Sequence, residues 1–256
     1  MLDEAAIRAA LPPLDVRVVD SCASTNAELL AGDATPALLV ADHQTGGRGT
    51  RGRRWHAAPG AGLLMSLRHP LDRPLRELSG LSLAAGVAVL RALRALGVPA
   101  VELKWPNDIL TAGAKLGGIL VETRMQGGRV LAVIGCGLNW NAAPKGWHVA
   151  PRGLPLRLAA ASLADCLHPP PSRNAGAAAI ARELLAAIGE FEREGLAAFR
   201  GEWEAAHAHA GRRVRVRLAG GRVLTGTAVG LEPDGSLKLR TRRGLRAVQS
   251  GTVRPV

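Results

Sequence analysis

The chain has 256 residues, 47% of them hydrophobic and 21% charged, which is typical of a globular protein with one large and one small domain. It has no run of eighteen apolar residues, and its acidic start, Met1–Glu4, lacks a signal-peptide hydrophobic region, so we expect neither a membrane span nor secretion. Its cysteines, Cys22, Cys136 and Cys166, are far apart and form no CxxC pair, which argues against a disulfide framework or a zinc site and favours the cytoplasm.

The net charge of +12 is concentrated at the C-terminal end of the chain. Between Gly211 and Val256 ten Arg and one Lys stand against Glu232 and Asp234, a net charge of +9, so the first 210 residues carry only +3. Such a basic segment attracts phosphates or an acidic protein partner. A solvated charged face explains the same composition, and the sequence leaves both interpretations open.

The first hundred residues alternate between helix and strand patterns. Helices are predicted over residues 3–10, Thr25–Leu30 and Ser79–Leu96, and strands over Val16–Val19, Leu38–Ala41 and Gly62–Leu67. Thr25 and Glu28 have the spacing of a capping box, and Ser79 and Gly97 are the expected start and end signals of the third helix. A Gly/Arg-rich loop, Thr45–Arg54, lies between the second and third strands.

Short strands continue in the second half, over Val101–Trp105, Ile109–Thr111, Ile119–Arg124 and Val130–Cys136. A loop is expected over residues 142–155, and then a long helical stretch, Ala175–His207, with Gly195 inside it. From Gly211 onward Val and Leu alternate with Arg, and two Gly-containing turns intervene, which predicts a small barrel of about five strands. We therefore expect two domains, residues 1–209 and 210–256.

The segment Gly47–Trp55 contains a literal GxGxxG, yet it does not fit the phosphate-binding loops that share its glycines. A dinucleotide site needs a helix immediately after the glycines, and Arg53–Gly60 is a poor helix start. A P-loop needs Lys-Ser/Thr after the last glycine, where this chain has two arginines. Four guanidinium groups on a flexible backbone are suited to binding carboxylates or phosphates. A solvated arginine loop and an RNA-binding strip remain open alternatives.

Three further segments place polar groups beside apolar strands. They are Lys104-Trp105-Pro106-Asn107-Asp108, Lys115-Leu116-Gly117-Gly118-Ile119-Leu120-Val121-Glu122 and Gly135-Cys136-Gly137-Leu138-Asn139-Trp140-Asn141. Arginine outnumbers lysine 29 to 4, so the two lysines in these segments suggest positions that require a compact ammonium group. Each segment taken alone is also compatible with an ordinary turn.

In order along the chain, these segments resemble biotin protein ligases. The resemblance runs from about Val16 to the C-terminus and is carried by Ser24-Thr25-Asn26, by Gln44 with Gly47-Arg48-Gly49, by Lys104–Asp108, by Lys115–Leu120 and by Gly137-Leu138-Asn139. It implies an α/β (α+β) fold: a mixed-sheet catalytic domain like those of class II synthetases, followed by a small SH3-like β-barrel. It also implies the activity, in which biotin and ATP form biotinoyl-5′-AMP and pyrophosphate, and a lysine of an acceptor then takes the biotin and releases AMP.

The resemblance also implies a role for individual residues. Arg48, Lys115 and Asp108 are the expected catalytic residues. Biotin binding is expected at Ser24, Thr25, Asn26, Gln44, Gly47, Arg48, Gly49, Thr50, Lys115, Gly117 and Gly118. ATP binding is expected at Arg48, Arg51, Arg53, Trp55, Lys104, Asn107, Lys115 and Asn139. Mg²⁺ is expected on the ATP phosphates, without a metal site of the protein's own.

The implied partner is the biotin carboxyl carrier domain of a biotin-dependent carboxylase. Specific DNA binding is not expected, because only 23 residues precede Ser24 and a winged helix-turn-helix reader needs roughly 60. Three alternatives remain. A lipoate or octanoate ligase shares the fold and the lysine but lacks this combination of motifs. A basic nucleic-acid-binding module is suggested by the arginine-rich end, and a biotin-binding protein without catalysis is opposed by the intact Arg48, Lys115 and Asp108.

One residue departs from the family pattern, in which another arginine often occupies the position of Thr50. Because threonine is shorter and uncharged, we predict looser closure over the acyl-adenylate and faster release of biotinoyl-AMP. Measuring adenylate release from the parent and from Thr50→Arg tests this, with slower release expected from the variant. Equal rates would contradict the prediction.

Overall fold

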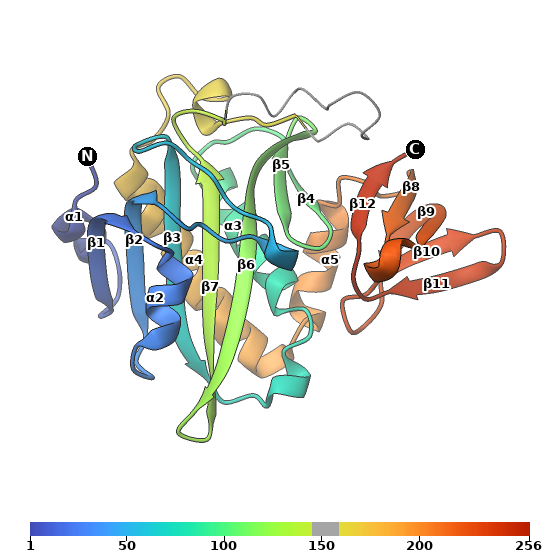
Figure 1. Cartoon of the computed structure of the whole chain (residues 1–256), viewed down its shortest axis with the longest axis horizontal. Helices are drawn as coiled ribbons and strands as arrows, with labels where there is room; N and C mark the ends of the chain where they lie inside the picture. Colours follow the sequence, from blue (N-terminus) through green and yellow to red (C-terminus); the bar gives the residue numbers. More distant parts are fainter. Residues whose placement is uncertain (145–158) are drawn as a thin grey trace.

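The computed structural model describes residues 1–144 and 159–256, which form two β-sheets with five helices packed around the larger one (Figure 1). Most of the predicted loop over 142–155 lies outside the described residues. The larger sheet contains β1 (Asp15–Cys22), β2 (Ala37–Gln44), β3 (Gly62–Leu71), β4 (Val101–Lys104), β5 (Asp108–Thr111), β6 (Ala114–Gln126) and β7 (Arg129–Asn139). Their spatial order is β1-β2-β3-β7-β6-β5-β4, with β1 and β2 parallel and the other pairs antiparallel.

Helices cover both faces of this mixed sheet (Figure 1). They are α1 (Glu4–Ala9), α2 (Thr25–Ala31), α3 (Leu81–Ala95), α4 (Arg173–Glu194) and α5 (Ala197–Ala205). Helices α3 and α4 pack on one face, and α2 packs on the other, against β2, β3, β6 and β7. Within the described ranges, none of these helices is both long and apolar enough to cross a membrane.

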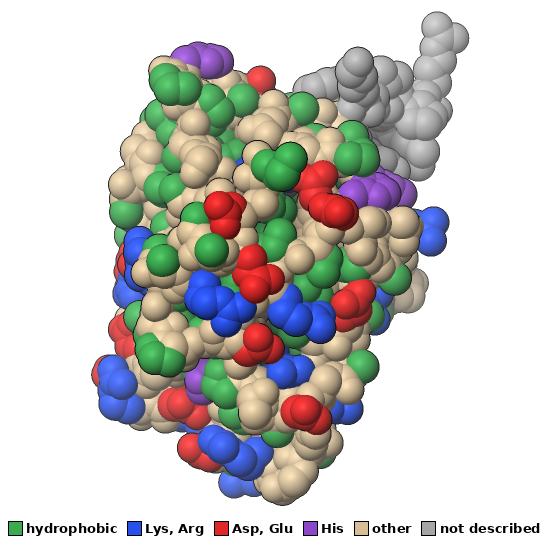
Figure 2. Space-filling model, turned by 90° about the vertical axis from the view of Figure 1, so that its left-hand side faces the viewer, with side chains coloured by type: hydrophobic (Ala, Val, Ile, Leu, Met, Phe, Trp, Pro, Cys, Tyr) green, Lys and Arg blue, Asp and Glu red, His purple; other side chains and the backbone are tan. Residues whose placement is uncertain are grey.

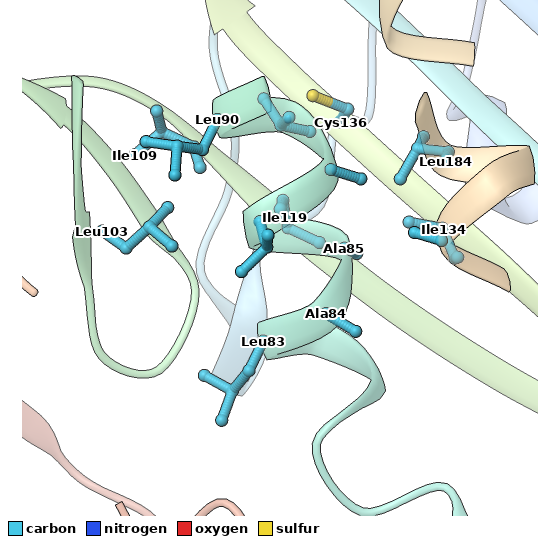
Figure 3. Close-up of a cluster of buried hydrophobic side chains, with 14 of the residues drawn as sticks. Leu83, Ala84, Ala85, Leu90, Leu103, Ile109, Ile119, Ile134, Cys136 and Leu184 are labelled. Carbon is cyan, nitrogen blue, oxygen red and sulfur yellow. The ribbon is translucent and has the colours of Figure 1, made fainter. Parts of the chain in front are cut away.

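The main core lies between the sheet and helix α3 (Figure 3). Eleven residues of α3 are buried, far more than one face of the helix, because α4 and α5 cover the side that the sheet does not. Ala84 and Ala85 let the helix approach closely, while Ile134 and Cys136 of β7 point toward the helices. Because successive residues of a strand point to opposite faces of the sheet, Gly135 and Gly137 face the side that α2 covers.

A five-stranded antiparallel sheet forms the C-terminal domain. Its strands are β8 (Arg213–Arg217), β9 (Val223–Leu231), β10 (Leu237–Thr241), β11 (Gly244–Val248) and β12 (Thr252–Pro255), in the order β11-β10-β9-β8-β12. In β8 the two valines are fully buried and the three arginines are exposed, as the alternation in the sequence predicts. The predicted mixed-sheet domain followed by a small antiparallel β domain is therefore confirmed.

The two sheets are joined by contacts to the turn between β9 and β10. The indole N–H of Trp105 donates to Gly235 O at 3.0 Å, and the Ser79 hydroxyl donates to Asp234 O. The carboxylate of Glu204 in α5 accepts from the backbone N–H of Leu231 at 2.8 Å. Trp105 is only 2% exposed, so its indole is part of the shared core.

Three local predictions were wrong. Helix α2 is capped by Ser24, whose hydroxyl accepts from Ala27 N, and Thr25 is the first helical residue, so the Thr25–Glu28 capping box does not form. Gly80 rather than Ser79 precedes α3. The long helical stretch is two helices, because Gly195 adopts a positive φ of 67° that ends α4 and redirects the chain into α5.

Two helical glycines give a matched test of the packing. A Cβ added to Gly176 in α4 would lie 2.2 Å from the buried Trp140 ring, whereas one added to Gly201 in α5 meets no atom within 4 Å. We expect Gly176→Ala to lower the free energy of unfolding by about 1–3 kcal/mol through overpacking. Gly201→Ala should raise it by about 0.5–1 kcal/mol, because alanine loses less backbone entropy than glycine on folding. Denaturant unfolding measures both, and a shift of both variants in the same direction would contradict this packing.

Candidate functional site

A pocket of about 670 Å³, its open mouth included, lies on the α2 face of the larger sheet. Its walls come from the N-terminus of α2, the loop after β2, and strands β6 and β7. The residues lining it are Ser24, Thr25, Asn26, Gln44, Arg48, Gly49, Thr50, Arg53, Arg54, Trp55, Met65, Asn107, Lys115, Gly118, Ile119, Leu120, Gly135, Cys136 and Gly137. Segments separated by more than 100 residues in sequence thus meet at one site.

One end of the pocket is polar and uncharged. The Gln44 amide oxygen accepts from the backbone N–H of Thr25 at 2.7 Å and from the Thr25 hydroxyl at 3.2 Å. The Ser66 hydroxyl, fully buried on β3, lies 2.7 Å from Thr25 Oγ1 and 2.6 Å from Asn26 Oδ1. The Asn26 amide donates to Leu120 O at 3.1 Å. These groups hold one another in fixed orientations, which suits recognition of a neutral ligand group with its own donors and acceptors.

Two glycines make the floor of the pocket flat. A Cβ on Gly135 would lie 2.1 Å from Asn26 Oδ1, and one on Gly137 would lie 2.8 Å from the Trp55 indole. Both glycines face the pocket from β7, so Asn26 and Trp55 rest directly on the sheet backbone. Neither glycine was among the site residues predicted from the sequence.

The Gly/Arg loop folds back on itself over the pocket. Gly49 N donates to Arg53 O at 2.7 Å, and Trp55 N donates to Gly47 O at 3.0 Å. At the tip, a single turn of 3₁₀ helix over Thr50–Gly52, the Thr50 hydroxyl accepts from the Arg53 guanidinium at 2.7 Å. The loop is therefore an ordered small hairpin in which the short Thr50 side chain serves as an internal hydrogen-bond partner.

Two guanidinium groups tie this loop to the rest of the molecule. Arg48 donates to a carboxylate oxygen of Glu122 on β6 at 2.9 Å, and the same oxygen accepts from the Asn26 amide at 2.9 Å. Arg51 donates to Gly251 O at 2.6 Å and to the Thr252 hydroxyl at 2.8 Å in the C-terminal domain. Glu122 thus connects the polar end of the pocket to the loop, although it was not among the predicted site residues.

A buried group of three charges lies beside the other end of the pocket. The Asp108 carboxylate accepts from Lys104 through one oxygen and from Lys115 through the other. Burial alone raises the pKa of Asp108, but the two ammonium groups outweigh it and lower that pKa to about 2. The Lys115 ammonium also lies 5.7 Å from the centre of the Trp55 ring, within cation–π range. Asp108 is therefore ionised and holds Lys115 at the pocket wall.

Most of the predicted site residues meet in this pocket, and six do not line it: Gly47, Arg51, Lys104, Asp108, Gly117 and Asn139. Gly47 and Gly117 are needed for close packing, since a Cβ on either would collide with Trp55 O or with Leu138. The amide of Asn139, 3% exposed, donates to Ala161 O at 2.9 Å, and its side-chain oxygen has no partner among the described residues. All but Lys104, which contacts Asp108, are adjacent in sequence or by contact to residues that do line the pocket.

Comparison with known proteins gives a consistent result. The sequence model of the biotin/lipoate A/B protein ligase family matches residues 18–139, and that of the biotin protein ligase C terminal domain matches residues 209–254. The biotin–[acetyl-CoA-carboxylase] ligase of Mycobacterium tuberculosis is 38% identical over 245 residues, which cover 92% of this chain and 87% of that protein.

Two solved structures have a similar fold. The biotin protein ligase from Aquifex aeolicus in complex with biotin and ATP has a TM-score of 0.75 at 24% identity, over 94% of this chain and 99% of that one. The biotin protein ligase from Leishmania major in complex with biotinyl-5-AMP has a TM-score of 0.60 at 26% identity, over 96% of this chain and 99% of that one.

The Arg48–Glu122 ion pair predicts how firmly the loop is held. We expect Glu122→Gln to keep the hydrogen bond with Asn26 but to weaken the one with Arg48, because the charge is removed. Partly exposed ion pairs contribute about 0.5–1 kcal/mol, so loop opening should increase about two- to fivefold. Limited trypsin cleavage after the loop arginines measures this. The control is Glu28→Gln, which breaks the exposed Arg17–Glu28 pair, and equal acceleration in both variants would contradict the prediction.

Proposed function

Because the chain belongs to the biotin protein ligase family, we propose that this pocket joins biotin to the AMP portion of ATP, releasing pyrophosphate, and then passes the biotinoyl group to a lysine of an acceptor protein. The carrying observation is that one pocket is lined both by the neutral polar groups of Thr25, Asn26 and Gln44 and by the cations Arg48 and Lys115. Biotin has a neutral ureido ring at one end and a carboxylate at the other. These two groups therefore match the two kinds of side chain that line the pocket.

At the polar end, we assign the ureido group to Thr25, Asn26 and Gln44, supported from behind by Ser66. Ser24 contributes as the cap that begins α2, and the glycines of the loop and of β6, Gly47, Gly49, Gly117 and Gly118, let the backbone approach the ligand. Thr50 lines the same pocket from the loop. The apolar side chain of Leu120, which pairs with Gly135 and so faces the α2 side of the sheet, suits the valeryl chain between the two ends.

The two cations of the lining, Arg48 and Lys115, are proposed to hold the biotin carboxylate beside the ATP α-phosphate. A carboxylate oxygen attacks the α-phosphorus, the bond to the bridging oxygen breaks, and pyrophosphate leaves with its electrons. Two anions must approach each other in this step, so preorganised cations lower its barrier. Arg48 is paired with Glu122 in the described structure, and the substrate anion would replace Glu122 as the partner of Arg48.

The state of Asp108 favours a positioning role over a proton-accepting one. The resemblance left both open, as orienting the acceptor amine or taking its proton. The two neighbouring ammonium groups outweigh the effect of burial and lower the pKa of this carboxylate to about 2, so it is a weak base at neutral pH. We propose that Asp108 keeps Lys115, and behind it Lys104, charged and aimed. The acceptor lysine, with an ordinary pKa of about 10.4, would then lose its proton to solvent or to the substrate.

The nucleotide is assigned to the region beside Trp55. The indole offers a face for the adenine, and its buried N–H has no partner among the described residues. Arg53 and Asn107 line the pocket at this end. Arg51, Lys104 and Asn139 lie behind the lining, so we propose that they support the nucleotide site, Arg51 by joining the loop to the C-terminal domain.

We propose that Mg²⁺ arrives bound to the ATP phosphates. In the part of the chain that the structure describes, no group of three His, Cys, Asp or Glu side chains is arranged to hold a metal ion. The acidic groups nearest the pocket, Glu122 and Asp108, are already paired with Arg48 and the two lysines. When bound, the ion would neutralise phosphate charge, and the protein's own cations would position the reacting atoms.

The proposed acceptor is the biotin carboxyl carrier domain of a biotin-dependent carboxylase. We further propose residues 1–209 as the catalytic domain and 210–256 as the second domain. The break between the sheets supports this division, since α5 ends at Ala205 and β8 begins at Arg213. The loop that covers the pocket contacts both units.

The first experiment is to mix the protein with biotin and MgATP and to detect biotinoyl-AMP by mass spectrometry. Lys115→Ala should reduce its rate of formation about a hundredfold or more, because one preorganised charge contact is lost. Lys238→Ala, which removes a lysine paired with Glu232 in the C-terminal domain, is the control and should leave the rate unchanged. Near-normal adenylate formation by Lys115→Ala would contradict the assignment of that lysine.

A further inference from the structure

Helix α2 carries two of the residues assigned to the ureido group, Thr25 and Asn26, yet little apolar burial fixes its position. It has seven residues, and an isolated helix of that length is marginal in water, so contacts with the sheet must hold it. Its buried residues are Thr25, Asn26 and Leu29, of which only Leu29 is apolar. The placement of α2, and with it the polar end of the pocket, therefore depends on polar contacts.

Two arginines of the sheet reach the C-terminal end of α2. Arg68 on β3 donates to Leu29 O at 3.2 Å and, just beyond the helix, to Thr35 O at 2.8 Å. Arg124 on β6 donates to Gly32 O. The approach is close, since a Cβ on Gly32 would lie 2.0 Å from Arg68 Nη1. Because the last carbonyls of a helix have no partner within it, these guanidinium groups supply donors that α2 itself lacks.

Arg68 is a buried cation that binds neutral oxygens. It is 6% exposed, and no carboxylate in the described parts of the chain forms an ion pair with it. On the surface around α1 and β1, by contrast, basic and acidic side chains are interspersed (Figure 2), and Arg8 and Arg17 are paired with Glu4 and Glu28. A buried charge is costly unless hydrogen bonds compensate it. Those of Arg68 go to the end of α2, so its charge serves the placement of that helix.

The same two strands also hold the N-terminal end of α2. The Ser66 hydroxyl, two residues before Arg68, lies 2.6 Å from Asn26 Oδ1. The Glu122 carboxylate, two residues before Arg124, accepts from the Asn26 amide at 2.9 Å. Residues two apart on a strand share a face at a spacing of about 7 Å, and seven helical residues span about 10 Å. Each strand thus contacts α2 once at each end.

Resting on the proposed function, we propose that Arg68 and Arg124 are positioning residues for biotin, which hold the C-terminal end of α2 and so keep Thr25 and Asn26 aligned with the ureido group. Neither arginine is among the described residues that line the pocket, so both act through the helix. Without them α2 would shift on its remaining contacts and its polar groups would move away from the ligand. The cations assigned to the reacting groups lie on other segments, so ATP binding and the chemistry of bound biotin would stay unchanged.

The test compares Arg68→Met with the matched control Arg73→Met in the full chain. Arg73 makes the same kind of contact at the C-terminal end of α4, on the other face of the sheet, donating to Glu192 O at 2.9 Å and to Arg193 O at 3.3 Å. Calorimetry measures the Kd of biotin without ATP, and formation of biotinoyl-AMP gives kcat and the KM for biotin and for ATP.

Arg68→Met should raise the Kd and the KM for biotin about tenfold, as expected when about one hydrogen bond to the ligand is lost. Its kcat and its KM for ATP should stay within about twofold of the parent, the pattern of lost binding without lost catalysis. Arg73→Met should leave all of these constants unchanged. Arg124→Met, at a half-buried position with one contact to the helix, should raise the Kd for biotin about threefold.

Denaturant unfolding of every variant separates positioning from folding, and Arg124→Met tests the proposal even where Arg68→Met does not fold. A Kd for biotin that stays at the parent value in the folded variants of Arg68 and Arg124 overturns the proposal. An equal rise in Arg73→Met, or an equal loss of affinity for ATP and of kcat, overturns it too, because either shows a structural role alone. A parent that forms no biotinoyl-AMP contradicts the proposed function itself, whereas an active parent with unchanged biotin binding in the variants contradicts only the positioning role.

Discussion

The site depends on one carboxylate shared by two ammonium groups. Asp108 follows a tight turn after β4 and begins β5, Lys104 ends β4, and Lys115 enters β6, so three neighbouring strands must pair in register for the charges to meet. Lys104 and Asp108 are each only 6% exposed. Removing one partner would leave an uncompensated buried charge, which costs far more than the pair contributes. The register of the sheet edge and the charge of the pocket are thus fixed by the same interaction.

This edge is held in place by the second domain. Trp105, in the turn between the two strands, buries its indole and donates to Gly235 of the C-terminal domain. On the opposite side of β4, Leu103 exchanges backbone hydrogen bonds with Ala206 and Ala208, in the segment that leads into that domain. The C-terminal domain therefore supports both the charged group through Trp105 and the covering loop through Arg51. Although none of its described residues lines the pocket, it contacts two segments that hold pocket residues, the turn between β4 and β5 and the covering loop.

Periodic patterns and turn residues predicted most of the fold. The alternation of Val and Arg in β8 and the glycine turn between β6 and β7 are local signals, and both were confirmed. The caps of α2 and α3 and the break at Gly195 were predicted wrongly, because neighbouring residues of similar propensity compete for each position and tertiary contacts decide. Ser79, for example, donates to Asp234 in the other domain instead of capping α3.

The sequence also indicated the segments that form the site, since family motifs mark them one by one. It did not indicate Ser66 or Glu122, whose importance arises only from pairing across strands that are distant along the chain. A single serine in the apolar strand β3 was the available signal for the first. For the second it was a glutamate at the end of an apolar run on β6. Thr50, read as a missing arginine, proved to be the hydrogen-bond partner of Arg53.

The bare backbone of β7 has a consequence for which molecules the enzyme can accept. At Gly135 and Gly137 the proposed substrate pocket is lined by main chain, which cannot be exchanged for something smaller. Engineering the pocket for a bulkier analogue of biotin must therefore start at side chains such as Leu120, which faces the pocket from the neighbouring strand β6.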